Sequence, residues 1–172
     1  MGSEGYAKFI ESKVGPTVFV PGAFILPGGE VVGGHQGVHH FTIGQRKGLP
    51  NDVQQAAQKM GYGGELYVAA INLENGMVAL GADKNLFKSR LVAQGFNWMA
   101  GGDFTKDRRV IARIRSRHEG AAATARLFAG DRVIVDFDEP QRAITPGQAV
   151  VLYENDMVVG GGWIEKVQDA KA

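Results

Sequence analysis

The chain has 172 residues, 44% of them hydrophobic, which is enough for one ordinary domain or two small ones with a buried core. Lys and Arg number 19 and Asp and Glu number 18, so the net charge neither requires nor excludes a polyanionic partner. The sequence contains no cysteine, which excludes disulfides, thiolate or persulfide catalysis by this polypeptide, and sulfur-ligated zinc.

No segment of the sequence has the character of a membrane anchor. The most apolar early run, residues 14–26, contains Pro16 and Pro21 and is shorter than the roughly 20 residues that cross a bilayer. Residues 1–3 lack the basic, apolar and small-residue regions of a signal peptide. We therefore expect a cytoplasmic protein with no membrane partner.

The first part of the chain predicts one short helix and one hairpin. Residues 5–13 place Tyr6, Phe9 and Ile10 at helical spacing, which predicts an amphipathic helix of about two turns. Further along, the β-rich runs 23–26 and 30–32 flank a Pro-Gly-Gly sequence. Proline and glycine at this position are typical of a turn, so a hairpin is expected.

A histidine cluster follows the first hairpin. His35, His39 and His40 suggest a metal site, and with it an unrelated metal hydrolase, but the segment has no carboxylate and the chain has no thiol. The more common arrangement buries or stacks one of His39 and His40 and leaves the other exposed. We therefore expect no metal, and elemental analysis tests the alternative.

The histidines lead into the sequence TIGQRKGL, which contains several hydrogen-bond donors. Residues 42–44 fit a strand that ends at a glycine, after which Gln45, Arg46 and Lys47 are expected to project from a turn. Apart from the histidines, no group here titrates near neutrality, so this turn suits a phosphate or a base edge better than proton transfer.

A helix and a second hairpin are expected next. Asn51 resembles a helix cap to which Gln54 reaches back, and Gly61 is a natural stop; the helix is mostly polar and is expected to be a surface insertion. The runs 66–73 and 77–80 flank Asn-Gly, a pair that adopts the positive φ angles of a tight hairpin turn.

The second half of the chain reads as a series of short strands. Gly101-Gly102 is the best candidate for a joint, because consecutive glycines leave the backbone poorly restricted. The runs that follow are rich in Val and Ile and are separated by turn residues, among them Asp138-Glu139-Pro140. They are 110–117, 122–128, 132–137, 148–153 and 157–167. This spacing predicts a small barrel or sandwich.

The strongest charge pattern is a row of arginines. If residues 110–117 form a strand, period two places four guanidinium groups on one face. They belong to Arg109, Arg113, Arg115 and Arg117. Either carboxylates such as Glu119, Asp136 and Asp138 neutralise this row, or it binds phosphate groups. The pattern alone does not decide between these two interpretations.

No catalytic motif stands out. The sequence has no GxSxG, no P-loop, no HExxH and no GxGxxG after a strand. The glycine-rich run 158–165 is not followed by a helix, which argues against a phosphate loop. We expect its glycines to let a strand bend or pass close to another backbone.

Three segments together resemble a known family. HQGVHHFTIGQRKGL, RIRSR and AITPGQAVVLYENDMVVGGGWIE occur in the order and spacing of the C-terminal half of bacterial tRNA-specific 2-thiouridylases. The resemblance implies a mainly β chain with minor α: a small α+β central domain, residues 5–93, and an antiparallel β-barrel, residues 94–168. Residues 50–66 depart from the short link of the family, so we expect an extra surface helix there.

The resemblance also implies an activity for the parent enzyme. With ATP, the family activates C2 of the wobble uridine in certain tRNAs and replaces its oxygen by sulfur from a cysteine persulfide. The family's nucleotide loop and two cysteines are not found in this sequence. We therefore expect no cofactor and no catalytic residue in this chain, and no thiolation by it alone. The expected partners are tRNA, a separate catalytic domain and a sulfur-relay protein.

The resemblance further implies particular tRNA-binding residues. Arg115, Ser116 and Gln148 occupy positions at which the family contacts tRNA, although the family often has an aromatic residue at the position of Ser116. Arg113 and Arg117 join them because they share the predicted strand face. An alternative function is a protein-interaction module, in which Gln45, Arg46 and Lys47 face the catalytic domain or a relay protein; the same three residues are also candidates for tRNA contact.

Overall fold

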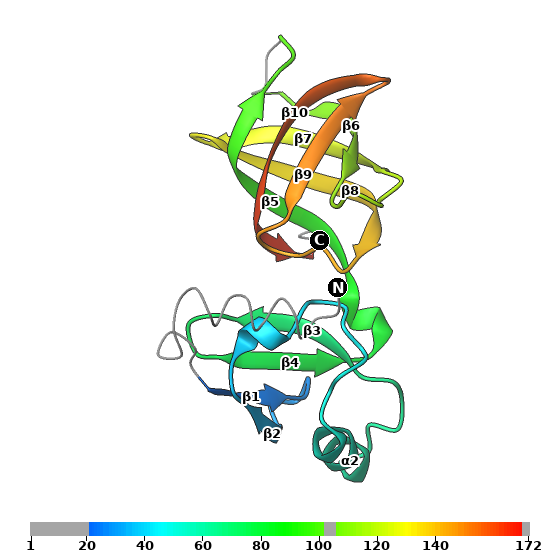
Figure 1. Cartoon of the computed structure of the whole chain (residues 1–172). Helices are drawn as coiled ribbons and strands as arrows, with labels where there is room; N and C mark the ends of the chain where they lie inside the picture. Colours follow the sequence, from blue (N-terminus) through cyan, green and yellow to red (C-terminus); the bar gives the residue numbers. More distant parts are fainter. Residues whose placement is uncertain (1–20, 102–105, 170–172) are drawn as a thin grey trace. The chain divides into compact units, whose positions relative to one another are not determined.

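The computed structural model describes residues 21–101 and 106–169, which form two compact units that divide between Leu86 and Phe87. Figure 1 shows the course of the chain through both units. The helix predicted over residues 5–13 lies outside the described residues. No helix in the described part of the chain is long and apolar enough to cross a membrane.

The first unit is built on one four-stranded sheet with the strand order β2-β1-β4-β3. Its strands are β1 (Gly22–Ile25), β2 (Val31–His35), β3 (Tyr67–Asn72) and β4 (Met77–Gly81). β1 pairs antiparallel with β2, and β3 with β4, which confirms both predicted hairpins. β1 also pairs with β4 in parallel, and this joins the hairpins into one sheet. The sequence pattern did not indicate that long-range pairing.

The second hairpin has a longer turn than the sequence predicted. Asn72 pairs with Met77, so residues 73–76 form the loop, and only Gly76 has a positive φ, of 68°. The side-chain oxygen of Asn72 accepts a hydrogen bond from the Glu74 amide at 2.9 Å, and that of Asn75 accepts one from Met77 at 3.0 Å. These side-chain bonds satisfy the loop backbone, so Asn75 does not need a left-handed conformation.

The predicted helix forms as α2 (Asn51–Lys59), but it is part of the core of the first unit. Val53 and Ala57 are fully buried, and a Cβ added to Gly33 of β2 would lie 2.5 Å from Val53 Cγ2. The prediction of a surface insertion therefore holds only for the polar, exposed face of the helix, because its apolar face is buried. Two short 3₁₀ helices, η2 (Val38–His40) and η3 (Asp83–Leu86), also lie in the described part of this unit.

The predicted cap of α2 is wrong in detail. Pro50 is the N-cap, and Asn51 is the first helical residue. The Gln54 side chain does reach back, but its amide donates to the carbonyl of Leu49 at 3.0 Å, which lies before the helix. The end of the helix is as predicted, because Gly61 follows the C-cap with a φ of 90°.

The second unit is a closed antiparallel barrel of six strands in the order β10-β5-β8-β7-β6-β9. The strands are β5 (Phe87–Trp98), β6 (Arg108–Arg113), β7 (Ala121–Ala129), β8 (Arg132–Arg142), β9 (Ala149–Glu154) and β10 (Met157–Gln168). Alternate residues of β6, Val110 and Ala112, are buried in the barrel core together with Leu152 and Val135. Their neighbours on β6 face outward, as period two requires.

The boundary between the units lies before β5 and not within it, where the sequence predicted it. This strand runs without interruption along both β8 and β10, from Phe87 opposite Arg142 to Trp98 opposite Gly160. A boundary between residues 93 and 94 would cut it, and Gly101 lies three residues beyond its end. The division falls instead after η3, because the hydrogen bonds of β5 belong to the barrel along its whole length.

β6 is shorter than the run that predicted it, and this breaks the row of arginines. The strand ends at Arg113, and residues 115–118 form a turn closed by a hydrogen bond from the His118 amide to the Arg115 carbonyl at 3.0 Å. Alternation of residue types predicts which face a side chain occupies, but it does not fix where a strand stops. Arg115 and Arg117 therefore lie in a loop and not on a strand face.

The predicted turn at residues 138–140 is instead an irregular part of β8. The register between β5 and β8 advances from Arg90 opposite Asp136 to Lys88 opposite Gln141, so β8 has extra residues there. Pro140 fits such a bulge because it has no amide hydrogen to donate to a ladder. Residues 138–140 therefore do interrupt regular strand pairing, as the sequence indicated, but they do so within one long strand and not between two strands.

The glycine run of β10 behaves as predicted. A Cβ on Gly160 would lie 2.6 Å from the carbonyl oxygen of Asn97, and one on Gly162 would lie 2.9 Å from that of Gln94. Both oxygens belong to the neighbouring strand β5. The glycines therefore allow two backbones to approach closely where the barrel closes.

Candidate functional site

A cleft on the outside of the barrel brings together four of the five predicted tRNA-binding residues. Its volume is about 460 Å³. It is lined by Arg113, Arg115, Ser116, Gln148, Ala149, Val151 and Tyr153. We call this the barrel cleft. The remaining predicted residue, Arg117, is exposed in the same loop but does not line the cleft.

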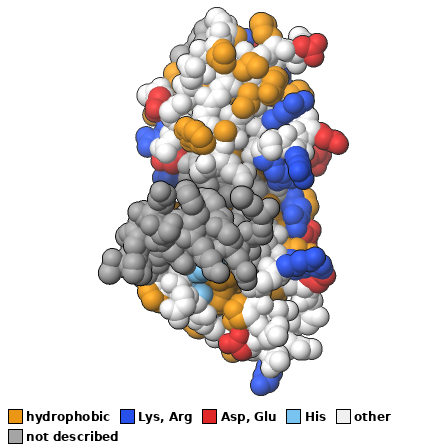
Figure 2. Space-filling view, viewed as in Figure 1, with side chains coloured by type: hydrophobic (Ala, Val, Ile, Leu, Met, Phe, Trp, Pro, Cys, Tyr) orange, Lys and Arg blue, Asp and Glu red, His pale blue; other side chains and the backbone are white. Residues whose placement is uncertain are grey.

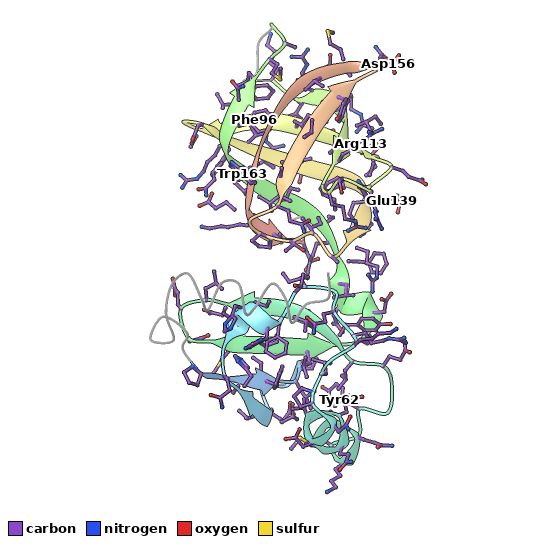
Figure 3. All side chains as sticks on the ribbon, in the orientation of Figure 1. Tyr62, Phe96, Arg113, Glu139, Asp156 and Trp163 are labelled. Carbon is purple, nitrogen blue, oxygen red and sulfur yellow. The ribbon has the colours of Figure 1, made fainter. Side chains whose placement is uncertain are left out.

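The two cleft arginines are held in different ways. Arg113, at the end of β6, places its guanidinium carbon 5.0 Å from the centre of the Tyr153 ring. Arg113, labelled in Figure 3, is exposed on the outer face of β6. Arg115 donates from Nη1 to the carbonyl of Arg142 at 3.2 Å, which ties its loop to the end of β8. Both side chains are exposed, so their remaining N–H groups are available to a ligand.

Gln148 is positioned by a turn, as the sequence predicted. Gly147 has a φ of 85° and donates its amide to the carbonyl of Ile164 at 2.8 Å, and Ile164 donates back to the carbonyl of Gln148 at 2.8 Å. The backbone at Gln148 is therefore engaged on both sides. Its side chain is exposed immediately before β9 and lines the cleft, where its amide can both donate and accept hydrogen bonds.

Most other arginines of the barrel are neutralised by carboxylates. Arg109 makes a bidentate pair with Asp138, with one N–O distance of 2.7 Å, and Arg108 pairs with Glu154. The arginine hydrogen bonds lower the pKa of both Asp138 and Glu154 below the usual range. Figure 2 shows Asp and Glu side chains beside several Lys and Arg side chains on one face of the chain.

The cleft arginines differ from these. Among the described residues, no carboxylate lies within ion-pair distance of Arg113, Arg115 or Arg117. Asp136, expected to neutralise the row, instead pairs with Arg90 and Arg126. Neutralisation by carboxylates is therefore correct for Arg109 and wrong for the arginines at the cleft.

The predicted donors of the first unit are largely occupied within the unit. Gln45 accepts a hydrogen bond from the Thr42 amide at 3.0 Å and donates to the Lys47 carbonyl at 3.0 Å. Arg46 forms an ion pair with Glu65. Of the three, only Lys47 is exposed with no ion pair among the described residues. Gln45 and Arg46 are therefore donors as expected, but their partners lie within the first unit.

The backbone explains why this segment is a loop and not the predicted strand. The Gly44 amide donates to the carbonyl of Val68 at 2.8 Å, and the Val68 amide donates to the carbonyl of Gln45 at 2.9 Å. Gly44 and Gly48 have φ angles of 87° and 82°, which a side chain rarely adopts. The segment therefore touches β3 at one point and then turns away.

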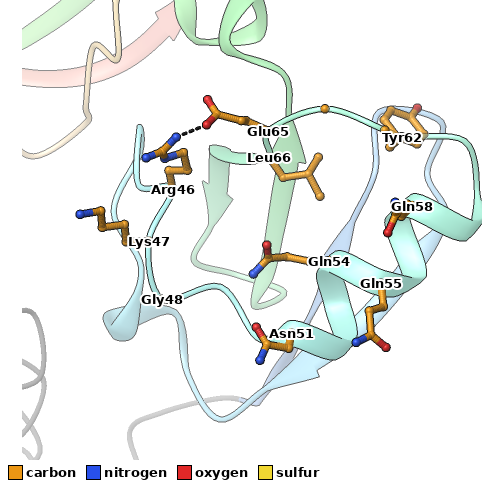
Figure 4. Close-up of a pocket in the computed structure, with 12 residues that line it drawn as sticks. Arg46, Lys47, Gly48, Asn51, Gln54, Gln55, Gln58, Tyr62, Glu65 and Leu66 are labelled. Carbon is orange, nitrogen blue, oxygen red and sulfur yellow. Dashed lines mark hydrogen bonds and ion pairs between the residues drawn. The ribbon is translucent and has the colours of Figure 1, made fainter.

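This loop and α2 border a concave surface of the first unit, of about 680 Å³ (Figure 4). Besides Arg46 and Lys47, it is lined mainly by amide side chains of the helix. These are Asn51, Gln54, Gln55 and Gln58. Sequence reasoning did not identify this surface, although the positions of Gln54, Gln55 and Gln58 on one helical face are a signal that could have found it.

The three histidines have packing or hydrogen-bonding contacts within the first unit. His35 is buried between Phe24 and Phe41; its Nε2 donates to the Gly76 carbonyl at 2.9 Å, and its Nδ1 accepts from the Gly37 amide at 3.1 Å. Burial lowers its pKa, and both ring nitrogens are used. The rings of His39 and His40 pack 4.0 Å apart. No cluster of possible metal ligands occurs in the part of the chain that the structure describes.

Sequence comparison first defines the class of the two units. Residues 7–82 match the family model described as the tRNA methyl transferase PRC-barrel domain, and residues 88–164 match that of the aminomethyltransferase beta-barrel domain. The second match coincides with the closed barrel and includes all the residues of the barrel cleft. The chain therefore joins one domain of each class.

Curated relatives then define the family. The tRNA-specific 2-thiouridylase MnmA of Koribacter versatilis is 46% identical over 143 residues, which are 83% of this chain and 36% of the relative. That of Lachnoclostridium phytofermentans is 42% identical over 161 residues, which are 94% of this chain and 42% of the relative. The chain belongs to the tRNA-specific 2-thiouridylase family, as a C-terminal region, and spans about two fifths of the length of these relatives.

Proposed function

We propose that this chain binds tRNA through the barrel cleft, as the tRNA-contacting region of a 2-thiouridylase. The observation that carries the proposal is the convergence of Arg113, Arg115 and Gln148 on one cleft that has no neutralising carboxylate among the described residues. Guanidinium groups match phosphate oxygens in geometry and charge, and the Gln148 amide adds an oriented hydrogen bond.

The difference in charge pairing between the cleft arginines and the other arginines of the barrel supports an anionic ligand at the cleft. The cleft arginines lie within the same unit as five arginines that do have carboxylate partners: Arg90, Arg108, Arg109, Arg126 and Arg132. Like charges that converge without counter-charges are unfavourable unless an anion joins them. A polyanion such as the tRNA backbone supplies that charge.

The role that we propose within the parent enzyme is to hold the substrate. The family transfers sulfur to C2 of the wobble uridine with ATP and a cysteine persulfide, and this polypeptide contains no cysteine to carry that sulfur. We therefore assign ATP and the persulfide donor to the catalytic domain or its sulfur-relay partner. The chain alone then binds tRNA without modifying it.

Salt dependence tests the proposal. The logarithm of the tRNA affinity of the full chain should fall linearly with the logarithm of the salt concentration, and Arg115→Ala should make the slope shallower by about one unit or less. Arg132→Ala is the matched control, because Arg132 pairs with Glu165 outside the cleft. No binding at low salt, or equal effects of the two variants, would contradict the proposal.

A second candidate function is favoured by the concave surface of the first unit. Its amide side chains and Lys47 suit a protein partner, such as the catalytic domain, that presents backbone and acidic groups. Because Glu65 neutralises Arg46, Lys47→Glu is a sharper test than Arg46→Glu. If Lys47→Glu abolishes co-purification with a separately expressed catalytic domain and Arg115→Ala does not, this docking function is supported.

A further inference from the structure

Tyr153 occupies a position that the predicted set of tRNA-binding residues did not include. It lies on β9 next to β6, where its backbone partner is Ile111 and the partner of Val151 is Arg113. Residues at such diagonal positions share a face of the sheet and touch when their side chains are long. Arg113 does so, with its guanidinium carbon 5.0 Å from the centre of the Tyr153 ring.

The ring also stands between two hollows on the barrel surface. Tyr153 lines the barrel cleft, where it is the only aromatic residue among the lining residues that the structure describes. It also lines a neighbouring hollow with Arg109, Ile111 and Asn155. The side chain is half-buried, so it is fixed in place and still presents part of its surface to solvent.

Arg113 contacts an aromatic ring, whereas other arginines of its strand contact carboxylates. Arg108 and Arg109 of the same strand are oriented by carboxylates, whereas Arg113 has no carboxylate partner among the described residues. The guanidinium group of Arg113 instead lies over the Tyr153 ring, at a distance typical of a cation–π contact. An arginine held against an aromatic ring keeps its N–H groups free for phosphate oxygens, and its plane can itself stack on a base.

We infer that Tyr153 and Arg113 form a stacking platform for one unpaired nucleobase of bound RNA. The inference rests on the proposed tRNA binding and adds the kind of RNA feature that the cleft takes. Arg115 and Gln148 face the same cleft and contact the backbone and the base edge, while Ser116 has a small side chain that leaves room for a ring. Stacking needs a base that is free of its helix, so the cleft selects single-stranded nucleotides over duplex RNA.

The test compares two RNA probes on the full chain, a single-stranded oligouridine and an RNA duplex of equal length. Tyr153→Leu should weaken binding of the single strand roughly fivefold to a hundredfold, the range expected for the loss of one stacked base. Duplex affinity should change less than about twofold, and the salt slope should not change because no charge is removed. Tyr153→Phe, which keeps the ring, should bind like the unmodified chain.

Phe128→Leu is the matched control, because Phe128 is an exposed aromatic residue of the barrel that does not line the cleft. It should bind both RNA probes like the unmodified chain. If Tyr153→Leu weakens single strand and duplex equally, Tyr153 only orients Arg113 and the platform is wrong. If it weakens neither while tRNA binding persists, the platform is also wrong but the proposed function stands. If the unmodified chain binds no RNA at low salt, both proposals fail.

A second measurement covers the case in which Tyr153→Leu does not fold. In the unmodified chain, the ring resonances of Tyr153 should shift upfield when the single strand is added, because a stacked base shields them. They should not shift when the duplex is added. Unchanged Tyr153 resonances under conditions in which the Arg115 side-chain resonances move would overturn the platform.

Discussion

The two units of this protein each present a concave surface with basic side chains, but they differ in which arginines are paired with a carboxylate. In the first unit, Arg46 is paired with Glu65 and Gln45 closes its own loop. In the barrel, Arg113 and Arg115 line a cleft without a carboxylate partner among the described residues. Sequences that look equally basic can therefore differ in their capacity to bind an anion, because internal pairing decides which charges remain available.

Charge reversal should give the largest difference between the two surfaces. Arg115→Glu places a negative charge where we propose that RNA phosphates bind, so tRNA affinity at low salt should fall by at least about tenfold. Arg46→Glu removes a charge that Glu65 already neutralises, and we expect a change of less than about threefold. Filter binding or fluorescence anisotropy at one low salt concentration measures both.

The reverse result would break the comparison. If Arg46→Glu lowers tRNA affinity more than Arg115→Glu does, then the first unit and not the barrel makes the principal contact. Circular dichroism of both variants is the necessary control, since Arg46→Glu sets two carboxylates beside each other.

A pair of glutamine substitutions should give an effect of intermediate size and sharpen the comparison. Gln45→Ala removes two side-chain hydrogen bonds that close the TIGQRKGL loop, so the free energy of unfolding of the first unit should fall by about 1 kcal/mol. Gln148→Ala removes an exposed side chain that makes none of the hydrogen bonds described for its turn, so stability should change by less than about 0.5 kcal/mol.

The effects on binding should be the opposite. Gln148→Ala should weaken tRNA binding a few-fold, and Gln45→Ala should leave it unchanged. Urea denaturation and tRNA titration of the same two preparations separate stability from binding. Equal losses of stability in both variants would show that the barrel turn depends on its glutamine as the loop does.

Acid should distinguish the units by the smallest effect that we expect, because one titrating histidine is involved. Burial lowers the pKa of His35 in the folded chain, so the unfolded state binds its proton first as the pH falls. The first unit should therefore lose stability as the pH drops below about 6.5, the usual value for histidine.

The barrel should behave differently in the same titration. The pKa values of Asp138 and Glu154 are lowered by their arginine partners, so the stability that these pairs contribute is present at neutral pH. It should be lost only below about pH 4.5, as the carboxylates become protonated. Hydrogen exchange followed by NMR between pH 7 and pH 4 reports each unit separately, and His35→Leu should remove the early loss.

Local patterns explain which parts of this site could be predicted. The Pro146-Gly147 turn and its presentation of Gln148 depend on residues close in sequence, and the structure has them as predicted. The same holds for the two hairpins of the first unit. The alternation of residue types correctly placed Arg113 on the outer face of β6. It also predicted a strand that continues past Arg113, so it wrongly placed Arg115 and Arg117 on the same strand face.

The residues that were missed depend on pairing between distant strands. Tyr153 meets Arg113 only because β9 lies beside β6, and its sequence neighbourhood gives no sign of that contact. Likewise, β5 belongs to the barrel because it pairs with β8 and β10. Its residue types alone did not distinguish it from the preceding unit.

The sequence by itself determined the mainly β character of the chain and its family resemblance. It also determined that the glycines of residues 158–165 permit close backbone packing, and that the basic side chains are concentrated in residues 109–117. Tertiary structure alone decided which cations are free, because an arginine and the carboxylate that neutralises it are 29 residues apart for Arg109 and Asp138 and 46 apart for Arg108 and Glu154. It also decided that the polar helix α2 is a core element. Charge pairing and burial depend on distance in space, and distance along the chain does not specify either.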